Sequence, residues 1–295
     1  MSFANQVMDQ AGTLRKMTKT MRNDIGILSQ GKAGNSTARG IAVASGKGGV
    51  GKTNIVANVA YSLVKLGKRV LIFDADVGLG NIHILLGLMP KYTLQNVLDG
   101  NREMGDILLE GPGGIKILPA SSGNKKFSEL STEEKLLLRG EFEFLENKFD
   151  YILFDIGAGI SSNVMYFCTG AHEIVIISTP EPTSFADAYA IMKVLSRDYM
   201  RSSFKLVVNS VKNKAEGVDI FNRLNKVADR FQLNISLNYL GHILSDDSVT
   251  KSVREQKLFL EKYPNAPASV CVRSIAREII NTNIEQGLEW DSFLK

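Results

Sequence analysis

The chain has 295 residues, of which 44% are apolar, and its 35 basic and 31 acidic residues leave a net charge of only +4. This composition suffices for one large or two small globular domains, and such a charge does not by itself indicate nucleic-acid or lipid binding. The two cysteines lack C-x-x-C spacing, so neither a disulfide framework nor a metal cluster is indicated. Because the sequence shows neither a secretory signal nor a long apolar run, we expect a cytoplasmic protein.

Residues 3–28 are predicted to form an amphipathic helix ahead of the main domain, and we assign residues 1–28 to an N-terminal arm. Its apolar side chains recur with steps of four and three residues, and most charged side chains lie off this seam. Two interpretations stay open: the helix packs on its own domain, or a partner binds it in a groove. Residues 29–39 are predicted to be a flexible linker.

The next stretch has the order strand, glycine-rich loop, helix. An apolar run at 41–44 is followed by Ser-Gly-Lys-Gly-Gly-Val-Gly-Lys-Thr at 45–53, which fits the phosphate-loop pattern G-x-x-x-x-G-K-[ST]. Backbone N–H groups and the helix dipole would hold a polyphosphate, Lys52 would reach its β- and γ-phosphates, and Thr53 would ligate Mg²⁺. The alternative is a glycine-rich turn without a ligand. The predicted nucleotide-binding residues are Gly46, Lys47, Gly48, Gly49, Val50, Gly51, Lys52, Thr53 and Asn54.

Two further strands are predicted to end in carboxylates. The apolar run 69–73 delivers Asp74 and Asp76 to the carboxyl end of a strand, followed by a switch loop at 77–81, and the run 151–154 ends in Asp155. Asp155 is the expected Walker B residue. Of Asp74 and Asp76, one carboxylate would hold a metal-bound water and the other would orient the attacking water. The alternative is that the first pair only caps the next helix.

The remaining elements alternate in type. Besides the strands already named, we predict strands at 115–119, 174–178, 204–208 and 237–243, and helices at 84–89, 94–100, 131–147, 183–195, 220–231 and 268–281. From residue 40 to 283 this pattern favours one doubly wound, largely parallel sheet with helices on both faces. Asn209, at a strand end, is placed for a purine edge, and the lack of a guanine-type motif there favours adenine. His83, His172 and His242 lack metal-ligand spacing and are expected to be structural.

Lys47, the first lysine of the loop, is not explained by phosphate binding alone. Lys-Gly-Gly-Val-Gly-Lys-Thr resembles the deviant Walker A sequence of the MinD/ParA family. The resemblance implies a slow ATPase with ATP and Mg²⁺ as cofactors, in which ATP is sandwiched in a homodimer. It implies catalytic roles for Lys47 in trans, Lys52 in cis and Asp76, metal binding through Thr53, Asp74 and Asp155, and adenine recognition by Asn209. Residues 155–160 resemble the family's switch II, with Ile-Gly in place of the usual Ser-Pro.

Within that family, residues 9–15 resemble the Asp-Gln-Ala-x-x-Leu-Arg arm of the FlhG group, regulators of flagellar number and placement. This resemblance implies that the arm stimulates an FlhF-type GTPase of the signal-recognition-particle class, with Gln10 contributing to that site. It also implies flagellar C-ring switch proteins as partners, and reversible membrane association. The predicted partner-binding residues are Asp9, Gln10, Ala11, Leu14 and Arg15.

The tail 284–295 leaves the membrane contact open, because it carries three acids and one lysine beside Trp290, Phe293 and Leu294. The alternatives within the superfamily are a MinD-type division-site regulator and a ParA-type DNA-partitioning ATPase, and the modest charge disfavours DNA. An iron–sulfur carrier is disfavoured by the missing C-x-x-C.

Overall fold

The computed structural model describes residues 38–76, 80–120 and 130–282. The predicted arm, residues 29–37 of the predicted linker, part of the predicted first switch loop and the tail lie outside these residues. The strands are β1 (Arg39–Ser45), β2 (Val70–Ala75), β3 (Leu109–Glu110), β4 (Lys116–Leu118), β5 (Tyr151–Ala158), β6 (Glu173–Ser178), β7 (Ser203–Val211) and β8 (Ser236–Leu244). The helices are α2 (Lys52–Lys65), α3 (Ile82–Leu85), α4 (Leu94–Leu98), α5 (Thr132–Glu146), α6 (Ser162–Gly170), α7 (Pro182–Tyr199), α8 (Lys214–Arg230), α9 (Asp247–Arg254), α10 (Phe259–Lys262) and α11 (Pro267–Asn281), with two 3₁₀ turns at Met104–Ile107 and Pro112–Gly114.

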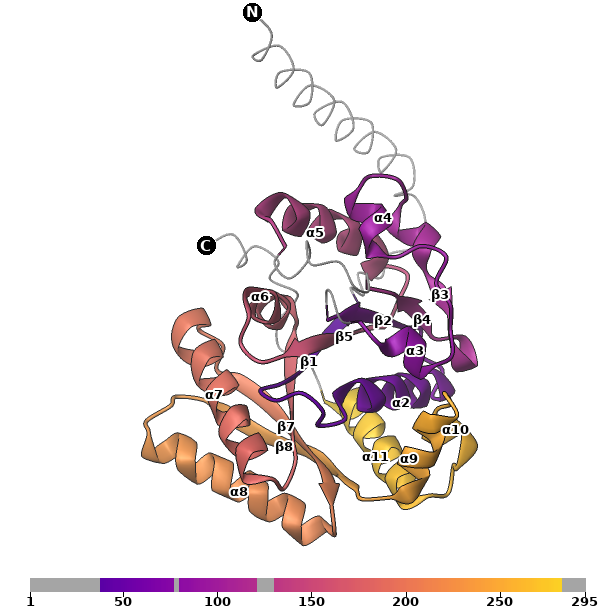
Figure 1. The fold of residues 1–295 in the computed structure, drawn as a ribbon. Coiled ribbons are helices and arrows are strands. Elements are labelled where there is room, and N and C mark those ends of the chain that lie inside the picture. Colours follow the sequence, from indigo (N-terminus) through magenta and orange to yellow (C-terminus); the bar gives the residue numbers. More distant parts are fainter. Residues whose placement is uncertain (1–37, 77–79, 121–129, 283–295) are drawn as a thin grey trace, which may run out of the picture. The chain divides into compact units, whose positions relative to one another are not determined.

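The strands form one sheet in the described part of the chain, in the order β3-β4-β2-β5-β1-β6-β7-β8 (Figure 1). Every pairing is parallel except that of β3 with β4. The central strands β1 and β2 are buried along their whole length, as their continuous apolar sequences predict for strands covered on both faces. The predicted doubly wound, largely parallel sheet is therefore confirmed.

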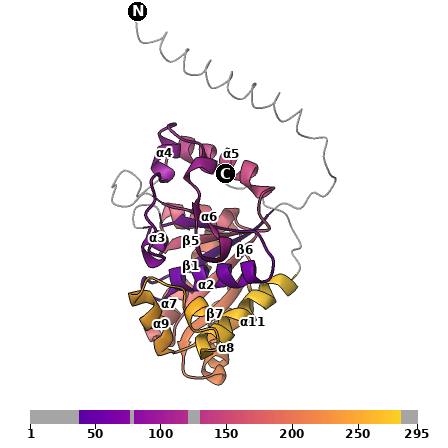
Figure 2. The same ribbon diagram turned by 90° about the vertical axis from the view of Figure 1, so that its right-hand side faces the viewer.

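Helices cover both faces of this sheet, and the alternation of side chains along each strand supplies both cores (Figure 2). In β1, Ala42 and Ala44 belong to the core under α4 to α8, whereas Ile41 and Val43 belong to the core under α2, α3, α10 and α11. The first core contains a cluster of four phenylalanine rings with centroids 5.1 to 6.1 Å apart, from Phe73, Phe142, Phe154 and Phe167. Such mostly edge-to-face contacts fix β2 and β5 against α5 and α6.

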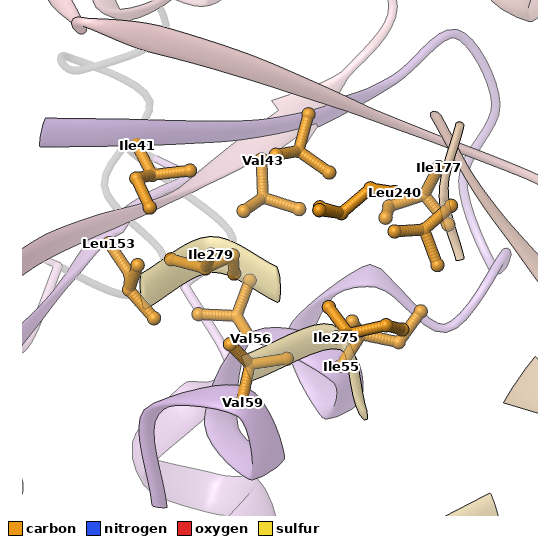
Figure 3. Close-up of a pocket in the computed structure, with 12 residues that line it drawn as sticks. Ile41, Val43, Ile55, Val56, Val59, Leu153, Ile177, Leu240, Ile275 and Ile279 are labelled. Carbon is orange, nitrogen blue, oxygen red and sulfur yellow. The ribbon is translucent and has the colours of Figure 1, made fainter. Parts of the chain in front are cut away.

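The second core contains a small cavity between the sheet and helices α2 and α11 (Figure 3). Val56 and Val59 of α2 point towards it from below, Ile275 and Ile279 of α11 lie beside them, and Ile41 approaches from the sheet. All the lining side chains are aliphatic. A site for a polar ligand needs convergent polar groups, so we regard this cavity as a packing defect of the core.

Several elements begin or end elsewhere than predicted. β1 starts at Arg39, one residue inside the predicted linker, because the Arg39 guanidinium is buried and donates to the carbonyl oxygens of Ile279 and Thr282 at the end of α11. α8 begins at Lys214 rather than 220, because Asn213 caps it by accepting from the N–H of Glu216 at 3.0 Å. Asn213 is thus the N-cap of α8, and residues 214–216 form its first turn.

Three helices were not predicted: α6, α9 and α10. α6 is buried from Asn163 to Gly170, so it has no polar face. α9 has eight residues and only two apolar side chains, Val249 and Val253, of which Val249 packs against the second core and Val253 is exposed. α10 has only four residues. Of the two cysteines, Cys168 is buried and Cys271 is partly exposed.

His172 has the structural role expected of it, because its Nδ1 accepts a hydrogen bond from the N–H of Gly40 at 2.8 Å. Burial lowers the pKa of His172 from 6.5 to about 4. The unfolded chain therefore binds a proton between these pH values that the folded chain does not, and stability is lost as the pH falls through this window. Asparagine at position 172 can accept the same hydrogen bond through its side-chain oxygen but does not titrate. We therefore expect the free energy of unfolding of His172→Asn to fall by about 1–2 kcal/mol less than that of the wild type between pH 7 and pH 4.5, a range that allows for the partial exposure of His172. Urea unfolding at pH 7 and pH 4.5 measures the difference, and parallel pH profiles for the two proteins would contradict the assignment.

Candidate functional site

The phosphate-loop sequence lies between the end of β1 and the start of α2, as predicted. Gly49 and Gly51 have φ values of 79° and 87°, in the left-handed region where a side chain is strained. Gly51 is the N-cap of α2 and no side chain caps this helix, so the N–H groups of its first turn face the loop. This geometry is that of an anion-binding turn.

Gly46 makes the closest contact between the loop and the rest of the domain. A Cβ atom built on Gly46 would lie 2.2 Å from the carbonyl oxygen of Asp187 in α7, whereas nothing lies within 4 Å of one built on Gly48. The absence of a side chain at Gly46 thus lets the loop pack directly on the backbone of α7.

This difference gives a matched pair of variants. We expect Gly46→Ala to lower the free energy of unfolding by about 1–3 kcal/mol, because backbone must move to admit the methyl group. Gly48→Ala is expected to change it by less than about 0.5 kcal/mol. Urea unfolding without nucleotide measures both values, and equal destabilisation by the two substitutions would show that the contact with α7 is not the cause.

Two of the three predicted carboxylates are brought together by strand pairing. Asp74 of β2 and Asp155 of β5 are register partners, so they lie side by side at the carboxyl edge of the sheet. Lys52, in the first turn of α2, places its Nζ 3.1 Å from Asp155 Oδ1, and this ion pair is buried. The phosphate loop and the Walker B strand are therefore joined by a direct charge pair.

Asp74 is fully buried, and its Oδ2 accepts a hydrogen bond from the N–H of Ile82 at 3.2 Å. Burial and the neighbouring Asp155 raise its pKa to about 8. Its Oδ1 has no hydrogen-bond partner among the described residues. A buried carboxyl oxygen without a partner costs free energy, and such groups mark sites where a proton, water or cation is bound.

Asp76 follows the end of β2 and is half-buried. Burial raises its pKa, while the positive charge of Lys52 acts in the opposite direction. Its carboxylate lies against Gly157, since a Cβ atom on Gly157 would be 3.0 Å from Asp76 Oδ1. The absence of a side chain at Gly157 therefore leaves room for the Asp76 carboxylate.

The Ile-Gly pair in the predicted second switch continues the strand. Ile156 is the register partner of Ala75, Ala158 is that of Ser45, and the N–H of Gly159 donates to the carbonyl oxygen of Ser45 at 3.0 Å. A proline at position 157, as in the family pattern, would lack an N–H group and interrupt such a ladder. Here the segment is held in β5 as far as Ala158.

The described residues fit a magnesium–phosphate pair better than a metal held by protein alone. No group of three or more histidine, cysteine, aspartate or glutamate side chains is arranged to hold a metal ion in residues 38–76, 80–120 and 130–282. Mg²⁺ takes few protein ligands and keeps water and phosphate oxygens. The Thr53 hydroxyl at the start of α2 and the oxygens of Asp74 and Asp155 would supply the protein part. This assignment of metal ligands stays a prediction.

Lys47 lies apart from the carboxylates and pairs with residues that sequence reasoning did not assign. Its Nζ lies 2.7 Å from Glu181 Oε2 and 3.2 Å from Thr183 Oγ1, at the start of α7. Both charged side chains are partly exposed, at 41% and 64%. The one sequence signal for this turn is Thr-Pro-Glu at 179–181, which lies between the predicted strand 174–178 and the predicted helix 183–195.

Asn54 and Asn209, both predicted to bind nucleotide, form hydrogen bonds with other residues of the protein. The Oδ1 of Asn54 accepts from Asn58 Nδ2 at 2.8 Å. Asn209 donates from its Nδ2 to the carbonyl oxygen of Val50 in the phosphate loop, also at 2.8 Å. Asp9, Gln10, Ala11, Leu14 and Arg15 lie outside the described residues, so their predicted role in partner binding stays a prediction.

A phosphate loop followed by strand-end aspartates on a doubly wound sheet defines a P-loop nucleotide-binding protein. Residues 41–259 match the family model described as the CobQ/CobB/MinD/ParA nucleotide binding domain, and the chain belongs to this family. It is 42% identical over 239 residues to the antiactivator FleN of Pseudomonas aeruginosa, covering 81% of this chain and 85% of FleN. It is 35% identical over 241 residues to the flagellum site-determining protein YlxH of Helicobacter pylori, covering 82% and 81%. The predicted family and the flagellar group within it are thus confirmed.

Solved structures agree with this assignment. A chain of the MinC:MinD cell division protein complex of Aquifex aeolicus aligns with a TM-score of 0.67 at 27% identity, covering 85% of this chain and 98% of that one. MinD of Pyrococcus horikoshii, solved with Mg-ADP, aligns with a TM-score of 0.66 at 22% identity, covering 83% and 96%. The second likeness supports the fold alone.

Proposed function

We propose that this protein is an ATP-driven dimerisation switch that controls the number or placement of flagella. The observation that carries the ATPase part is the joining of the phosphate loop to the Walker B strand through Lys52 and Asp155, with Asp76 beside them. The flagellar part is supported by the identity to FleN and YlxH, at 42% and 35%. The matching MinD of Bacillus subtilis is 30% identical.

In this proposal the described residues divide the work of phosphoryl transfer. Lys52 and the N–H groups of the loop bind the β- and γ-phosphates, and Asp76 orients the attacking water. Bound Mg²⁺ would neutralise developing charge on the phosphates, with Thr53, Asp74 and Asp155 on its protein side. Lys47 would leave Glu181 to reach the nucleotide of a second subunit, adding positive charge in the transition state.

The N-terminal arm is proposed to stimulate an FlhF-type GTPase. The test measures GTP hydrolysis by the partner enzyme with the full chain, with a chain lacking residues 1–30 and with Gln10→Ala. We expect the deletion to abolish stimulation and Gln10→Ala to reduce it strongly, while both variants still bind ATP. Gln6→Ala, on the same segment but outside the motif, is the matched control. Undiminished stimulation by the deleted chain would refute the role of the arm.

A division-site regulator of the MinD type is the second candidate, because the matches to MinD of Bacillus subtilis and of Synechocystis sp. each span 83% of this chain. The two candidates differ in the phenotype of gene removal. Loss of a flagellar regulator changes the number of flagella per cell, whereas loss of a division-site regulator displaces the septum. Counting both in the same deletion strain decides between them.

From the same resemblance we also propose that the protein associates reversibly with the membrane and binds switch proteins of the flagellar C-ring. Among the described residues, no helix has the length and apolar character needed to cross a bilayer. A peripheral contact through residues 284–295 is tested by co-sedimentation of the full chain with anionic vesicles, with and without ATP. Binding that survives removal of these residues would exclude the tail as the contact.

A further inference from the structure

Asn209 links a distant strand to the phosphate loop. It lies on β7, and its Nδ2 donates to the carbonyl oxygen of Val50, a residue 159 positions earlier in the chain. Val50 is buried, and it stands between Gly49 and Gly51, both with positive φ. Its carbonyl oxygen belongs to the turn that presents the loop N–H groups, so the Asn209 amide holds this turn from outside.

The contact is tight, and the backbone around Asn209 departs from the regular ladder to make it. A Cβ atom on Gly51 would lie 2.5 Å from Asn209 Nδ2, so the amide rests on the N-cap of α2. Ser210, the next residue, has a φ of 59°, and the pairing of β7 with β8 shifts register between Val208 and Val211. A non-glycine residue in this conformation is held there by its surroundings, often at a functional site.

The same hydrogen bond fixes which way the amide faces. A carbonyl oxygen can only accept, so the nitrogen of Asn209 must point to Val50 and its Oδ1 must point away. No described residue donates to Asn209 Oδ1. The side chain therefore presents an acceptor, which suits the exocyclic amine of adenine and opposes the carbonyl oxygen that guanine or hypoxanthine carries at that position.

We propose that Asn209 is a positioning residue of the phosphate loop, which holds the Val50 turn in its phosphate-binding conformation before any nucleotide arrives. The selectivity for adenine follows from the orientation that this contact imposes. The base-selectivity part rests on the proposed ATP function, whereas the positioning part does not. A residue that only contacts the base would leave the loop unchanged when it is removed.

A ligand without a base separates the two roles. The experiment measures the affinity of inorganic triphosphate with Mg²⁺, and of ATP and ITP, for the wild type and for Asn209→Ala by calorimetry. We expect Asn209→Ala to weaken triphosphate binding about two- to tenfold, the loss of one hydrogen bond, and to remove most of the preference for ATP over ITP. Asn213→Ala, which removes the amide that caps α8, is the matched control and is expected to leave all three affinities unchanged.

A second measurement needs no ligand and guards against a variant that folds poorly. Hydrogen exchange of the nucleotide-free proteins is compared at the amides of residues 46–52 and, as an internal standard, at those of the buried β5. We expect Asn209→Ala to accelerate exchange in the loop while β5 stays protected. Unchanged loop exchange together with unchanged triphosphate affinity would overturn the positioning role. Wild-type protein that binds triphosphate but not ATP would instead contradict the proposed function and leave the positioning role standing.

Discussion

Replacing Asp76 by alanine is expected to slow ATP hydrolysis by about 100- to 10,000-fold, the range that a positioned general-base or water-orienting group supplies. Asp76 follows the end of β2, where it is half-buried against Gly157 and close enough to Lys52 to feel its charge. Because Lys52 is paired with Asp155, the Asp76 carboxylate is left to orient a water molecule. ATP binding is expected to survive, because the loop and Lys52 are intact. If hydrolysis separates the subunits, the variant remains a dimer in ATP.

Size-exclusion chromatography with light scattering measures this result. Asp76→Ala is compared in ADP and in ATP, and we expect the mass to double only in ATP. Asp219→Ala, an exposed aspartate of α8 paired with Arg223, is the control and is expected to behave as the wild type. An Asp76→Ala protein that hydrolyses ATP at the wild-type rate, or is monomeric in both nucleotides, would contradict the proposed switch.

The second large effect is expected for Lys52→Met. Lys52 is the buried partner of Asp155, and its removal leaves an uncompensated carboxylate in the core beside Asp74. We expect the free energy of unfolding to fall by about 3–5 kcal/mol, the usual cost of breaking a buried pair from one side. ATP affinity is expected to fall about 10- to 100-fold, because a charged hydrogen bond to the phosphates contributes about 1.5–3 kcal/mol.

A double variant separates stability from binding. In Lys52→Met with Asp155→Asn the buried negative charge is removed as well, so we expect the free energy of unfolding to recover in part while ATP affinity stays low. Lys65→Met, at the exposed end of the same helix, is the control for the loss of a lysine. Urea unfolding and titration with a fluorescent ATP analogue give the two quantities. Lys52→Met with wild-type stability would show that the ion pair does not hold Asp155.

The sequence predicts the site best where one segment contains all the information. The order of apolar run, glycine loop and helix is encoded in one short segment, and so are the apolar runs of β2 and β5 that lead to Asp74 and Asp155. The predicted helix at 131–147 also appears, as α5, and it opens with a capping box in which Ser131 and Glu134 exchange hydrogen bonds. In these segments burial and local propensity favour the same structure.

The contacts that shape the site could not be predicted, because they join residues far apart in the chain. Lys47 meets Glu181 across 134 positions, and Asn209 meets Val50 across 159. Neither pair has a spacing that a sequence pattern would reveal. The second switch was also undetermined, since Ile156 and Gly157 suit either a loop or a strand, and only pairing with β1 and β2 selects the strand.

The hydrogen bond between Arg39 and the end of α11 indicates that the domain can be circularly permuted. Its guanidinium, at the first residue of β1, donates to the carbonyl oxygen of Thr282 at 2.8 Å, so the two ends of the described domain lie within the length of one side chain. A short peptide could therefore join residue 282 to residue 38 without crossing the domain. Opening the exposed turn between Asn101 and Arg102 would then create a circular permutant that keeps the sheet order and the phosphate loop.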